Sequence, residues 1–389
     1  MSSRSRHPQT RARHPGPILI VSHEASRTGA PRVAVDILRA LQPMDTRTVV
    51  VHRWGGPMRD ELDRAADGSA VEPLRHLRVI LRRWRATRGW ALAVERMGAS
   101  LVLRRLEPSL VWCNTVLSAA YVRPAQRRRI PVVLHGHELR PLVGSVLGRY
   151  GLTSAHGRSL PAGVHLAACS DEAANALGET VGVEPSSIAM LPSPVDVAEV
   201  RRRGHGSMLD PRRAHGRLRI VACARGDKRK GLDLFISLAA ALEKAQPKKY
   251  QCLWVGRIEE PSLLKGYRSI ECLGEVADPV PILASADIFV LTSRTDAFPL
   301  VVLEAMALER PVVAFAVGGV PQQLGDTGVL VEPENVSAMA DEVLRLGCDP
   351  EHRKNLGALE LQRVAELWDF PAFASQVRRL AEGALAEAQ

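Results

Sequence analysis

Two carboxylates, Asp296 and Glu304, stand eight positions apart in the stretch SRTDAFPLVVLEAMALERPVVAFAVGG, which runs from Ser293 to Gly319. The apolar residues between them recur at helical spacing, which places Asp296 at the mouth of a helix and Glu304 in its second turn. Both side chains could therefore face one bound ligand. Taken singly, Asp296 could instead cap the helix, and Glu304 could be an ordinary surface carboxylate.

The segments on either side indicate why a ligand would bind here. DIFVLT, residues 287–292, and PVVAF, residues 311–315, are short apolar runs typical of buried parallel strands. Pro299 suits the first turn of the helix between them, and the order strand, helix, strand implies a right-handed crossover. Residues 296–300 would then lie beyond the carboxyl end of a strand, where the helix N-terminus offers unpaired N–H groups and a partial positive charge. The pattern predicts a bound anion, with a phosphate as the expected one.

A basic loop follows another predicted strand, which begins at Leu218. The loop holds Arg225 and Lys230, with Arg229 as an alternative to either, and it precedes a predicted helix. Fixed cations at a strand end can stabilise the charge that a departing diphosphate gains, an effect of roughly several kcal/mol in a partly dry cleft. A solvated loop without a ligand is the other interpretation.

Two histidines, His135 and His137, follow the apolar run of IPVVLHGHEL, residues 130–139, and fall beyond a strand end. The pair could suggest a metal, but no third ligand lies nearby in sequence, and we expect the two side chains to point to opposite faces of an extended segment. No metal site is predicted. At the first predicted turn, Gly29 stands alone where a dinucleotide-binding dehydrogenase would need G-x-G-x-x-G, which removes the main support for that class.

The stretch from Ser293 to Gly319 resembles the donor-site signature of the family-4 retaining glycosyltransferases of the GT-B fold. In that signature two acidic residues separated by seven positions flank Phe-Pro and are followed by Ala-Met-Ala, as they are in residues 296–307 here. Asp296 departs from the pattern, because the family usually has Glu there. Gln322 and Gln323 are a second departure, since an acid usually follows the glycine pair closely.

The resemblance implies a role for each site residue. Glu304 would bind ribose hydroxyls and Asp296 the hydroxyls of the donor sugar, while Arg225 and Lys230 would hold the diphosphate. The backbone of Gly29 would approach the diphosphate, and His135 would contact the transferred sugar, with His137 as the second choice. N–H groups in the first turn of the signature helix would assist donor binding, and they belong to Phe298, Pro299 and Leu300.

The implied fold is of the α/β class: GT-B, with two facing Rossmann-like doubly wound domains, a cleft between them and a C-terminal helix crossing back to the first domain. We expect a disordered basic tail over residues 1–16, an acceptor-binding domain over 17–200, a linker over 201–217, a nucleotide-sugar-binding domain over 218–366 and the crossing helix over 367–389.

The implied activity is that of a hexosyl-type transferase of carbohydrate biosynthesis. It would move a sugar from a nucleotide-diphosphate sugar to a hydroxyl of an acceptor carbohydrate, glycolipid or natural product, with retention of anomeric configuration and without a metal or other cofactor. Two alternatives remain open. One is a nucleotide-sugar epimerase on the same fold, and the other is a catalytically silent sugar-nucleotide binding module.

Composition narrows the class of protein further. A chain of 389 residues suits two domains, and six scattered cysteines with no C-x-x-C pair favour a reduced, cytoplasmic protein. The net charge is +10, but an aromatic content of 4% and the lack of a zinc-finger or RNA-binding motif argue against nucleic acid as the partner. The apolar runs are too short to span a bilayer, and the basic N-terminus lacks the apolar core of a secretory signal.

The segment from Arg75 to Arg105 is the most biased in charge, with nine arginines against a single acid, Glu95. Its apolar residues are periodic, so we expect a basic face opposite an apolar one, as in helices that lie on anionic membranes. A solvated arginine face on a core-packed helix is the alternative. The membrane interpretation would place the protein at the inner face of the membrane. The apolar positions are Leu74, Leu77, Leu81 and Trp84.

Overall fold

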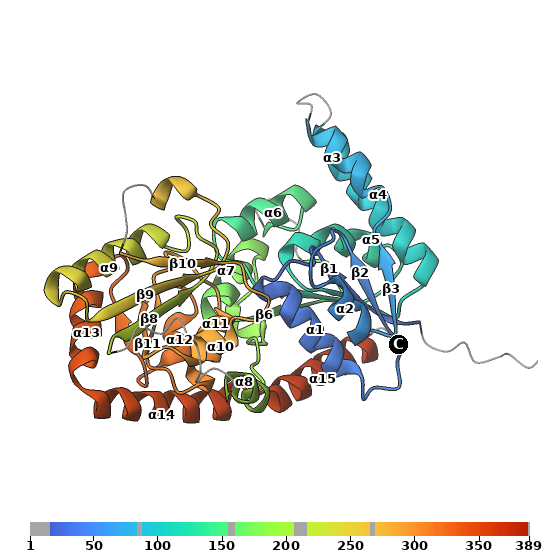
Figure 1. Cartoon of the computed structure of the whole chain (residues 1–389). Helices are drawn as coiled ribbons and strands as arrows, with labels where there is room; N and C mark the ends of the chain where they lie inside the picture. Colours follow the sequence, from blue (N-terminus) through green and yellow to red (C-terminus); the bar gives the residue numbers. More distant parts are fainter. Residues whose placement is uncertain (1–15, 84–87, 155–159, 206–215, 265–268, 388–389) are drawn as a thin grey trace, which may run out of the picture.

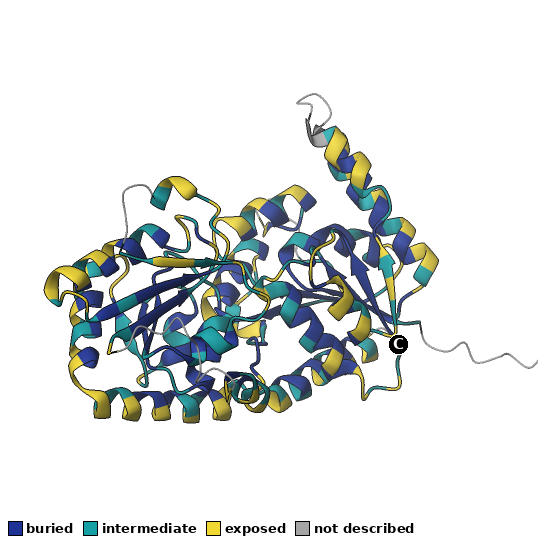
Figure 2. Cartoon of the chain, in the orientation of Figure 1, coloured by how far each residue is buried: buried dark blue, intermediate teal, exposed yellow. Residues whose placement is uncertain are grey.

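The structure is a computed structural model that describes residues 16–83, 88–154, 160–205, 216–264 and 269–387. Two parallel β-sheets form the centres of two domains that stand side by side (Figure 1). The central strands of both sheets include short apolar runs that are buried from end to end, as expected for a sheet covered by helices on both faces (Figure 2). The predicted pair of doubly wound domains is confirmed. The predicted tail over residues 1–16 lies outside the described residues, except for Gly16.

The first sheet has seven parallel strands in the order β3-β2-β1-β4-β5-β6-β7. Because the order reverses between β1 and β4, the carboxyl ends of these two strands border the crevice in which doubly wound sheets bind ligands. The strands are β1 (Ile18–Ser22), β2 (Thr48–His52), β3 (Gly68–Val71), β4 (Leu110–Cys113), β5 (Val132–Gly136), β6 (Val164–Ala168) and β7 (Ala189–Met190).

The second sheet has six parallel strands in the order β10-β9-β8-β11-β12-β13, with the same reversal between β8 and β11. The two predicted ligand loops, one basic and one carrying the signature, follow these two adjacent strands. The strands are β8 (Leu218–Cys223), β9 (Tyr250–Val255), β10 (Glu271–Gly274), β11 (Ile288–Leu291), β12 (Val312–Phe315) and β13 (Val329–Val331).

The helices of the first domain cover its sheet, apart from two that project outward as an antiparallel pair (Figure 1). We call this pair, α3 and α4, the helical hairpin. The helices are α1 (Gly29–Leu41), α2 (Arg59–Ala65), α3 (Arg75–Arg83), α4 (Arg88–Leu106), α5 (Val122–Gln126), α6 (Leu142–Tyr150) and α7 (Asp171–Val181).

On α3 the apolar residues do not pack on a core, so the alternative of a core-packed helix with a solvated arginine face is wrong for this helix. Leu77 is exposed, whereas Arg78 is buried against Glu95 of α4. The reason is that α3 packs on an ion-pair cluster at the root of the helical hairpin rather than on an apolar core. Trp84, which the expected apolar face included, lies outside the described residues.

The chain passes between the domains twice. α8 (Val197–Gly204) leaves the first domain and packs against α10 and α11 of the second, and α15 (Phe370–Ala386) returns to lie along α1 (Figure 1). The two crossing segments are hydrogen-bonded to each other, since the N–H of Val195 donates to the carbonyl oxygen of Trp368 at 2.9 Å. The expected helix crossing back to the first domain is therefore confirmed. The remaining helices are α9 (Leu232–Ala245), α10 (Val280–Ala284), α11 (Leu300–Ala307), α12 (Val320–Leu324), α13 (Val336–Cys348) and α14 (Pro350–Leu367).

The expected linker over residues 201–217 begins with helix rather than with irregular chain. Residues 201–204 form the last turn of α8, where Arg203 pairs with Asp278 and Arg201 Nη1 lies 2.7 Å from Glu309 Oε1. This turn was missed because charged pairs, not an apolar stripe, hold it in place. Residues 206–215 lie outside the described residues. In the described part of the chain, no helix is long and apolar enough to cross a membrane.

Candidate active site

The first helical turns of α1 and α11 face each other where the two domains meet. A Cβ atom added at Gly29, the first residue of α1, would lie only 3.8 Å from Leu300 Cδ1, at the start of α11. The opening of α1 is held to the first sheet, because Asn114 Nδ2, just past β4, donates to the carbonyl oxygen of Ala30 at 2.7 Å. Two helix N-termini, each with a partial positive charge, thus border one region.

An ion pair joins these two helices across the domains. Arg32 Nη2, in the second turn of α1, lies 2.5 Å from Glu304 Oε1, in the second turn of α11. The Glu304 side chain is only 3% exposed, and its negative charge raises the pKa of the Arg32 guanidinium further above its usual range. A buried carboxylate needs a partner of this kind, because an unpaired one would lose its hydration without compensation.

A second ion pair joins the two ligand loops of the second domain. Lys230 Nζ donates to Asp296 Oδ2, and both side chains are largely buried. Because α11 begins only at Leu300, with Pro299 as its capping residue, Asp296 does not cap this helix. The alternative in which Asp296 is a helix cap is therefore excluded, and its carboxylate is available to the site.

Glycine is required where the two loops touch. Gly231 has a φ of +74°, and a Cβ there would lie 1.8 Å from the carbonyl oxygen of Thr292, the residue that directly follows β11. The Thr292 hydroxyl donates to the carbonyl oxygen of Gly231 at 2.9 Å. This close backbone approach brings Lys230 within reach of Asp296.

Asp227 organises the rest of the basic loop. Its Oδ1 accepts a hydrogen bond from the backbone N–H of Lys230 at 2.7 Å, and its Oδ2 lies 3.7 Å from Arg225 Nη2. Arg225 is exposed, so its guanidinium can turn toward a ligand without leaving a buried partner. Arg229 is also exposed and donates to the carbonyl oxygen of Thr295 at 3.4 Å.

The two ion pairs belong to one electrostatic environment. Cys223, the last residue of β8, is half-buried, and desolvation raises the pKa of its thiol to about 12. The charge of Glu304 raises this pKa as well, while the charges of Arg32 and Lys230 lower it. Two cations and a carboxylate from three segments therefore lie close to a single thiol.

The glycine pair after β12 allows a second close approach. A Cβ at Gly318, whose φ is +54°, would lie 1.8 Å from the carbonyl oxygen of Asp296, and one at Gly319 would lie 2.0 Å from that of Ala297. A Cβ at Gly319 would also meet Ser170 Cβ of the first domain at 2.9 Å. The pair is needed for packing at the domain junction, and the N–H of Gly319 donates to the carbonyl oxygen of Asp296 at 3.1 Å.

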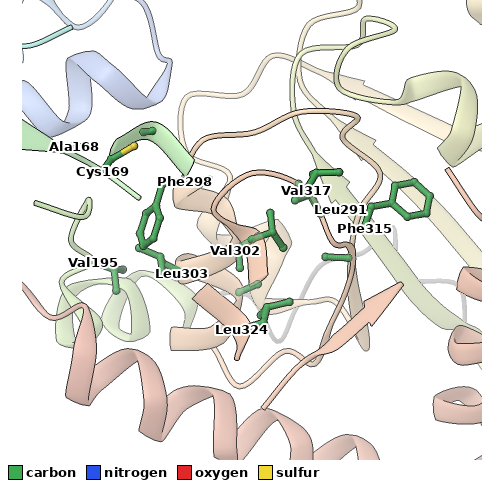
Figure 3. Close-up of a cluster of buried hydrophobic side chains, with 14 of the residues drawn as sticks. Ala168, Cys169, Val195, Leu291, Phe298, Val302, Leu303, Phe315, Val317 and Leu324 are labelled. Atoms are coloured by element: carbon green, nitrogen blue, oxygen red, sulfur yellow. The ribbon is translucent and has the colours of Figure 1, made fainter. Parts of the chain in front are cut away.

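We expected the N–H groups in the first turn of the signature helix to be free to bind a ligand. Part of this turn is instead buried. Phe298 is buried against Cys169 and Val195 of the first domain (Figure 3), with its ring 5.3 Å from that of Trp368. Pro299 has no N–H group to donate, so the expectation that its N–H assists donor binding is wrong. Backbone donation in this turn is left to Phe298 and Leu300.

The two glutamines that replace the usual acid have structural partners. Gln323 is fully buried, and its Nε2 donates to the carbonyl oxygen of Pro299 at 3.1 Å, a bond that an ionised carboxylate could not make. Gln322 Oε1 accepts from the N–H of Asp171, at the first turn of α7 in the first domain, at 3.0 Å. Together they fix the signature turn and tie it to the other domain.

His135 belongs to β5, where it pairs with Ala167 of β6, and His137 directly follows the carboxyl end of that strand. The expectation that both histidines lie beyond the strand is therefore wrong for His135. His135 is fully buried, with Nε2 3.0 Å from the carbonyl oxygen of Leu191 and Nδ1 3.1 Å from His137 Nε2. The expectation that the two side chains point to opposite faces is wrong: residues two apart in an extended segment share a face, and the ring centroids are 4.0 Å apart. Burial lowers the pKa of His135 to about 4 and that of His137 well below its usual range, so both rings are neutral at pH 7.

Sequence reasoning missed two residues of this region, Arg32 and Glu138. Glu138 Oε2 accepts hydrogen bonds from the N–H groups of Val116 at 3.2 Å and His137 at 3.0 Å, and burial raises the pKa of this carboxyl group to about 7. It thereby holds the position of His137. Its place directly after H-x-H at a strand end was a usable signal, whereas Arg32 looks like any polar residue of an amphipathic helix. Within the described ranges, no group of three or more His, Cys, Asp or Glu side chains is arranged to hold a metal ion.

Two protein families match the chain, one for each domain. The family described as Glycosyltransferase Family 4 matches residues 27–199, and the one described as Glycosyl transferases group 1 matches residues 217–349. The first match covers the first sheet apart from β1, and the second covers the second sheet with both ligand loops. Both families are defined by glycosyltransferases.

Individual relatives match in part. N-acetyl-alpha-D-glucosaminyl L-malate synthase of Bacillus anthracis is 36% identical over 106 residues, which are 27% of this chain and 28% of that protein. D-inositol 3-phosphate glycosyltransferase of Thermomonospora curvata is 28% identical over 251 residues, which are 58% of this chain and 57% of that protein. The chain thus spans between 28% and 57% of the length of these two relatives.

Solved structures share the whole architecture. The structure of HepE from Anabaena in complex with UDP and glucose matches 94% of this chain and 99% of its own, with a TM-score of 0.73 and 18% sequence identity. A likeness at this level of identity concerns the fold, and it confirms the predicted GT-B arrangement. Because a glycosyltransferase family matches each domain and the architecture is shared with solved structures, the chain belongs to the family-4 glycosyltransferases with the GT-B fold.

Proposed function

We propose that the protein transfers a sugar from a nucleoside-diphosphate sugar to a hydroxyl group of an acceptor, with retention of configuration at the anomeric carbon. The observation that carries the proposal is the convergence of Arg32, Lys230, Asp296 and Glu304 where the two domains meet. Such a set of charges, next to two helix N-termini, suits a ligand that has both a diphosphate and several hydroxyl groups.

In the ligand-free protein the charged groups are paired with one another. Donor binding would exchange these pairs: Glu304 would accept hydrogen bonds from the ribose hydroxyls, and Asp296 from the hydroxyls of the transferred sugar. Lys230 and Arg32, released from their carboxylates, would turn to the diphosphate, together with the exposed Arg225. Each exchange replaces one charge-assisted bond by another, so no buried charge loses its partner.

The same cations would serve catalysis. When the bond between the anomeric carbon and the diphosphate breaks, negative charge develops on the leaving phosphate, and positioned guanidinium and ammonium groups stabilise that charge most in the transition state. In this proposal Asp296 binds hydroxyls of the transferred sugar and Glu304 binds the ribose, so neither carboxylate acts as a nucleophile. Retention would follow from attack of the acceptor on the face from which the diphosphate leaves, with the departing phosphate accepting the acceptor's proton.

The first domain would bind the acceptor. His137 is the partly exposed member of its histidine pair, so we assign it the contact with the transferred sugar or the acceptor hydroxyl. His135, fully buried behind it, acts as a positioning residue that holds the ring of His137. The acceptor is a carbohydrate, a glycolipid or a natural product.

No divalent metal is needed in this proposal, because the side chains supply the positive charge that the diphosphate requires. We expect turnover to persist in the presence of a chelator. Loss of activity with EDTA and its recovery with manganese would contradict this part of the proposal.

The donor site can be tested by calorimetric titration with a panel of nucleoside diphosphates. At least one should bind, and Glu304→Ala should weaken its affinity by about 1.5 to 3 kcal/mol, the scale for losing hydrogen bonds to a charged group. Glu332→Ala removes an exposed carboxylate of the same domain and serves as the control. An affinity that is equal in the wild type and Glu304→Ala would refute the assignment of Glu304.

A transfer assay separates the enzyme from the alternatives. A catalytically silent binding module would bind nucleotide but release none from any nucleotide-sugar. An epimerase would convert the donor in the absence of an acceptor without releasing nucleoside diphosphate. The proposed transferase should release nucleoside diphosphate and form a product whose anomeric configuration, read by NMR, matches that of the donor.

A further inference from the structure

The helical hairpin of α3 and α4 exposes large apolar side chains, which a helix pair surrounded by water does not need. Of the α3 side chains that the structure describes, only Arg78 is buried, while Leu77 and Ile80, one turn apart, are 40% and 57% exposed. On α4, Trp90, Met97 and Leu101 share one face and are all exposed, with Trp90 at 68%. These exposed apolar residues belong to an element that stands away from the body of the protein (Figure 1).

The root of the helical hairpin, where α3 and α4 join the first domain, is polar and is held by ion pairs and hydrogen bonds. Arg53 Nε lies 2.5 Å from Glu72 Oε2, and Arg53 Nη2 lies 3.2 Å from Glu95 Oε1. Glu95 also pairs with Arg78 and accepts a hydrogen bond from the hydroxyl of Tyr150 at 2.7 Å. The root therefore fixes the direction of the helical hairpin and buries its one acidic residue.

The charge of this segment favours one class of partner. Residues 75–105 contain nine arginines and one acid, and that acid, Glu95, is buried between two arginines. No carboxylate of the segment is left to face outward. A second copy of the same surface would be repelled by it, whereas an anionic surface would be attracted.

The mixture of arginine with exposed tryptophan and aliphatic side chains suits a lipid interface better than an acidic protein. Indole rings prefer the headgroup region of a bilayer, aliphatic side chains insert below it, and arginines bind lipid phosphates. Counting Val79, six large apolar side chains are exposed on the described parts of the two helices, and a surface that recognised only an acidic protein segment would not need them.

We propose that the helical hairpin docks the protein on an anionic membrane surface, through Leu77, Ile80, Trp90, Met97 and Leu101 and the net positive charge of residues 75–105. The root lies at the acceptor side of the site: α3 follows the carboxyl end of β3, and Arg53 Nη1 donates to the carbonyl oxygen of Leu117, just past β4, at 2.5 Å. Resting on the proposed function, this placement implies that the acceptor is an amphiphile whose hydroxyl group is presented at the membrane surface.

Sedimentation of the full-length protein with vesicles tests the proposal. Vesicles of phosphatidylcholine with phosphatidylglycerol should bind the protein and release part of it as salt rises, whereas phosphatidylcholine alone should bind little. The double variant Ile80→Glu/Trp90→Glu should lower the bound fraction by about tenfold or more. Leu359→Glu changes a residue of similar exposure, 51%, on α14 of the second domain and should bind as the wild type does.

Nucleotide binding and thermal unfolding of each variant show whether it has folded. If the double variant does not fold, Trp90→Phe offers a second readout, because the blue shift of tryptophan emission on adding anionic vesicles should be largely lost with it. Equal binding to both kinds of vesicle, binding to neither, or full binding by a folded double variant would overturn the proposal. Sedimentation needs no sugar donor, so such a result would leave the proposed transfer reaction standing, and failure of nucleotide binding would leave the docking result standing.

Discussion

At the scale of single residues, the pair of Arg32 and Glu304 links donor binding to the contact between domains. The two side chains meet at 2.5 Å although 272 positions separate them in the chain. A nucleotide that takes the place of Arg32 at Glu304 leaves the guanidinium free to bind a phosphate. Domain contact and donor binding therefore use the same two groups.

If Arg32 joins the diphosphate site, Arg32→Met should weaken nucleoside-diphosphate binding by about 1.5 to 3 kcal/mol, the scale of a lost charge-assisted hydrogen bond. Arg39→Met, on the same helix but largely exposed, should leave the affinity unchanged. Calorimetry measures both. An affinity that stays the same or rises in Arg32→Met would mean that Arg32 only competes for Glu304 and does not contact the phosphates.

His135 predicts a pH dependence of stability. Burial lowers its pKa to about 4 from the ordinary histidine value of 6.5, so in acid the unfolded chain takes up a proton before the folded protein does. The stability that the neutral ring contributes is fully present above pH 6.5 and is lost as the pH falls through the window from 6.5 to 4. At 1.36 kcal/mol per pKa unit, the loss in unfolding free energy is about 3 kcal/mol.

His135→Gln does not titrate, and its amide can still donate to the carbonyl oxygen of Leu191. Urea unfolding of both proteins between pH 7 and pH 4 should show a steeper loss for the wild type. Parallel curves would mean that His135 does not cause the acid loss.

The sequence was sufficient to predict the residues of the signature and of the basic loop. Asp296, Glu304, Lys230 and Arg225 stand in runs whose apolar spacing reveals the flanking strands and helix, so their place at a strand end could be worked out. Their pairing could not, because it depends on how two domains pack. Arg32 was missed for the same reason: its partner is in another domain.

At the scale of elements, the strands that flank the signature followed from the sequence and the polar helices did not. β11 and β12 are fully buried apolar runs, and burial on both faces leaves a clear pattern. α8 and α3 are held by ion pairs instead, and such pairs do not produce the apolar periodicity by which a helix is predicted from sequence. The basic segment was identified as unusual, but the inward turn of Arg78 could be known only from Glu95 on the neighbouring helix.

The ion-pair cluster at the root of the helical hairpin gives a prediction about stability. Glu95→Ala would leave Arg53 and Arg78 buried with a lost partner, and it should lower the unfolding free energy by about 3 to 5 kcal/mol. Glu179→Ala breaks an exposed pair with Arg140 on the same domain and should cost about 1 kcal/mol or less. Urea unfolding distinguishes the two, and similar small effects would mean that the cluster does not hold the helical hairpin in place.

At the scale of the whole molecule, two sheets of the same topology bring their ligand-binding edges together. The junction is held by the paired crossing segments, by Gln322 with the N–H of Asp171, and by Arg27 Nη1 at 3.6 Å from Glu275 Oε1. The resemblance to a known family predicted this arrangement, and composition alone would have given only the number of domains. The site is made by both domains, so neither would contain it alone.

The most direct test of the account is the turnover of nucleotide-sugar by the wild type and by Asp296→Ala, measured as nucleoside-diphosphate release beside calorimetric affinity for the same nucleotide. The account predicts turnover by the wild type, and a loss of about ten- to a hundredfold or more in Asp296→Ala, because the donor sugar loses its positioning carboxylate. The affinity should not fall, since Lys230 is freed for the diphosphate, and Asp296→Glu should be tolerated. Turnover per folded molecule that is unchanged in Asp296→Ala, or no turnover by the wild type with any nucleotide-sugar, would contradict it.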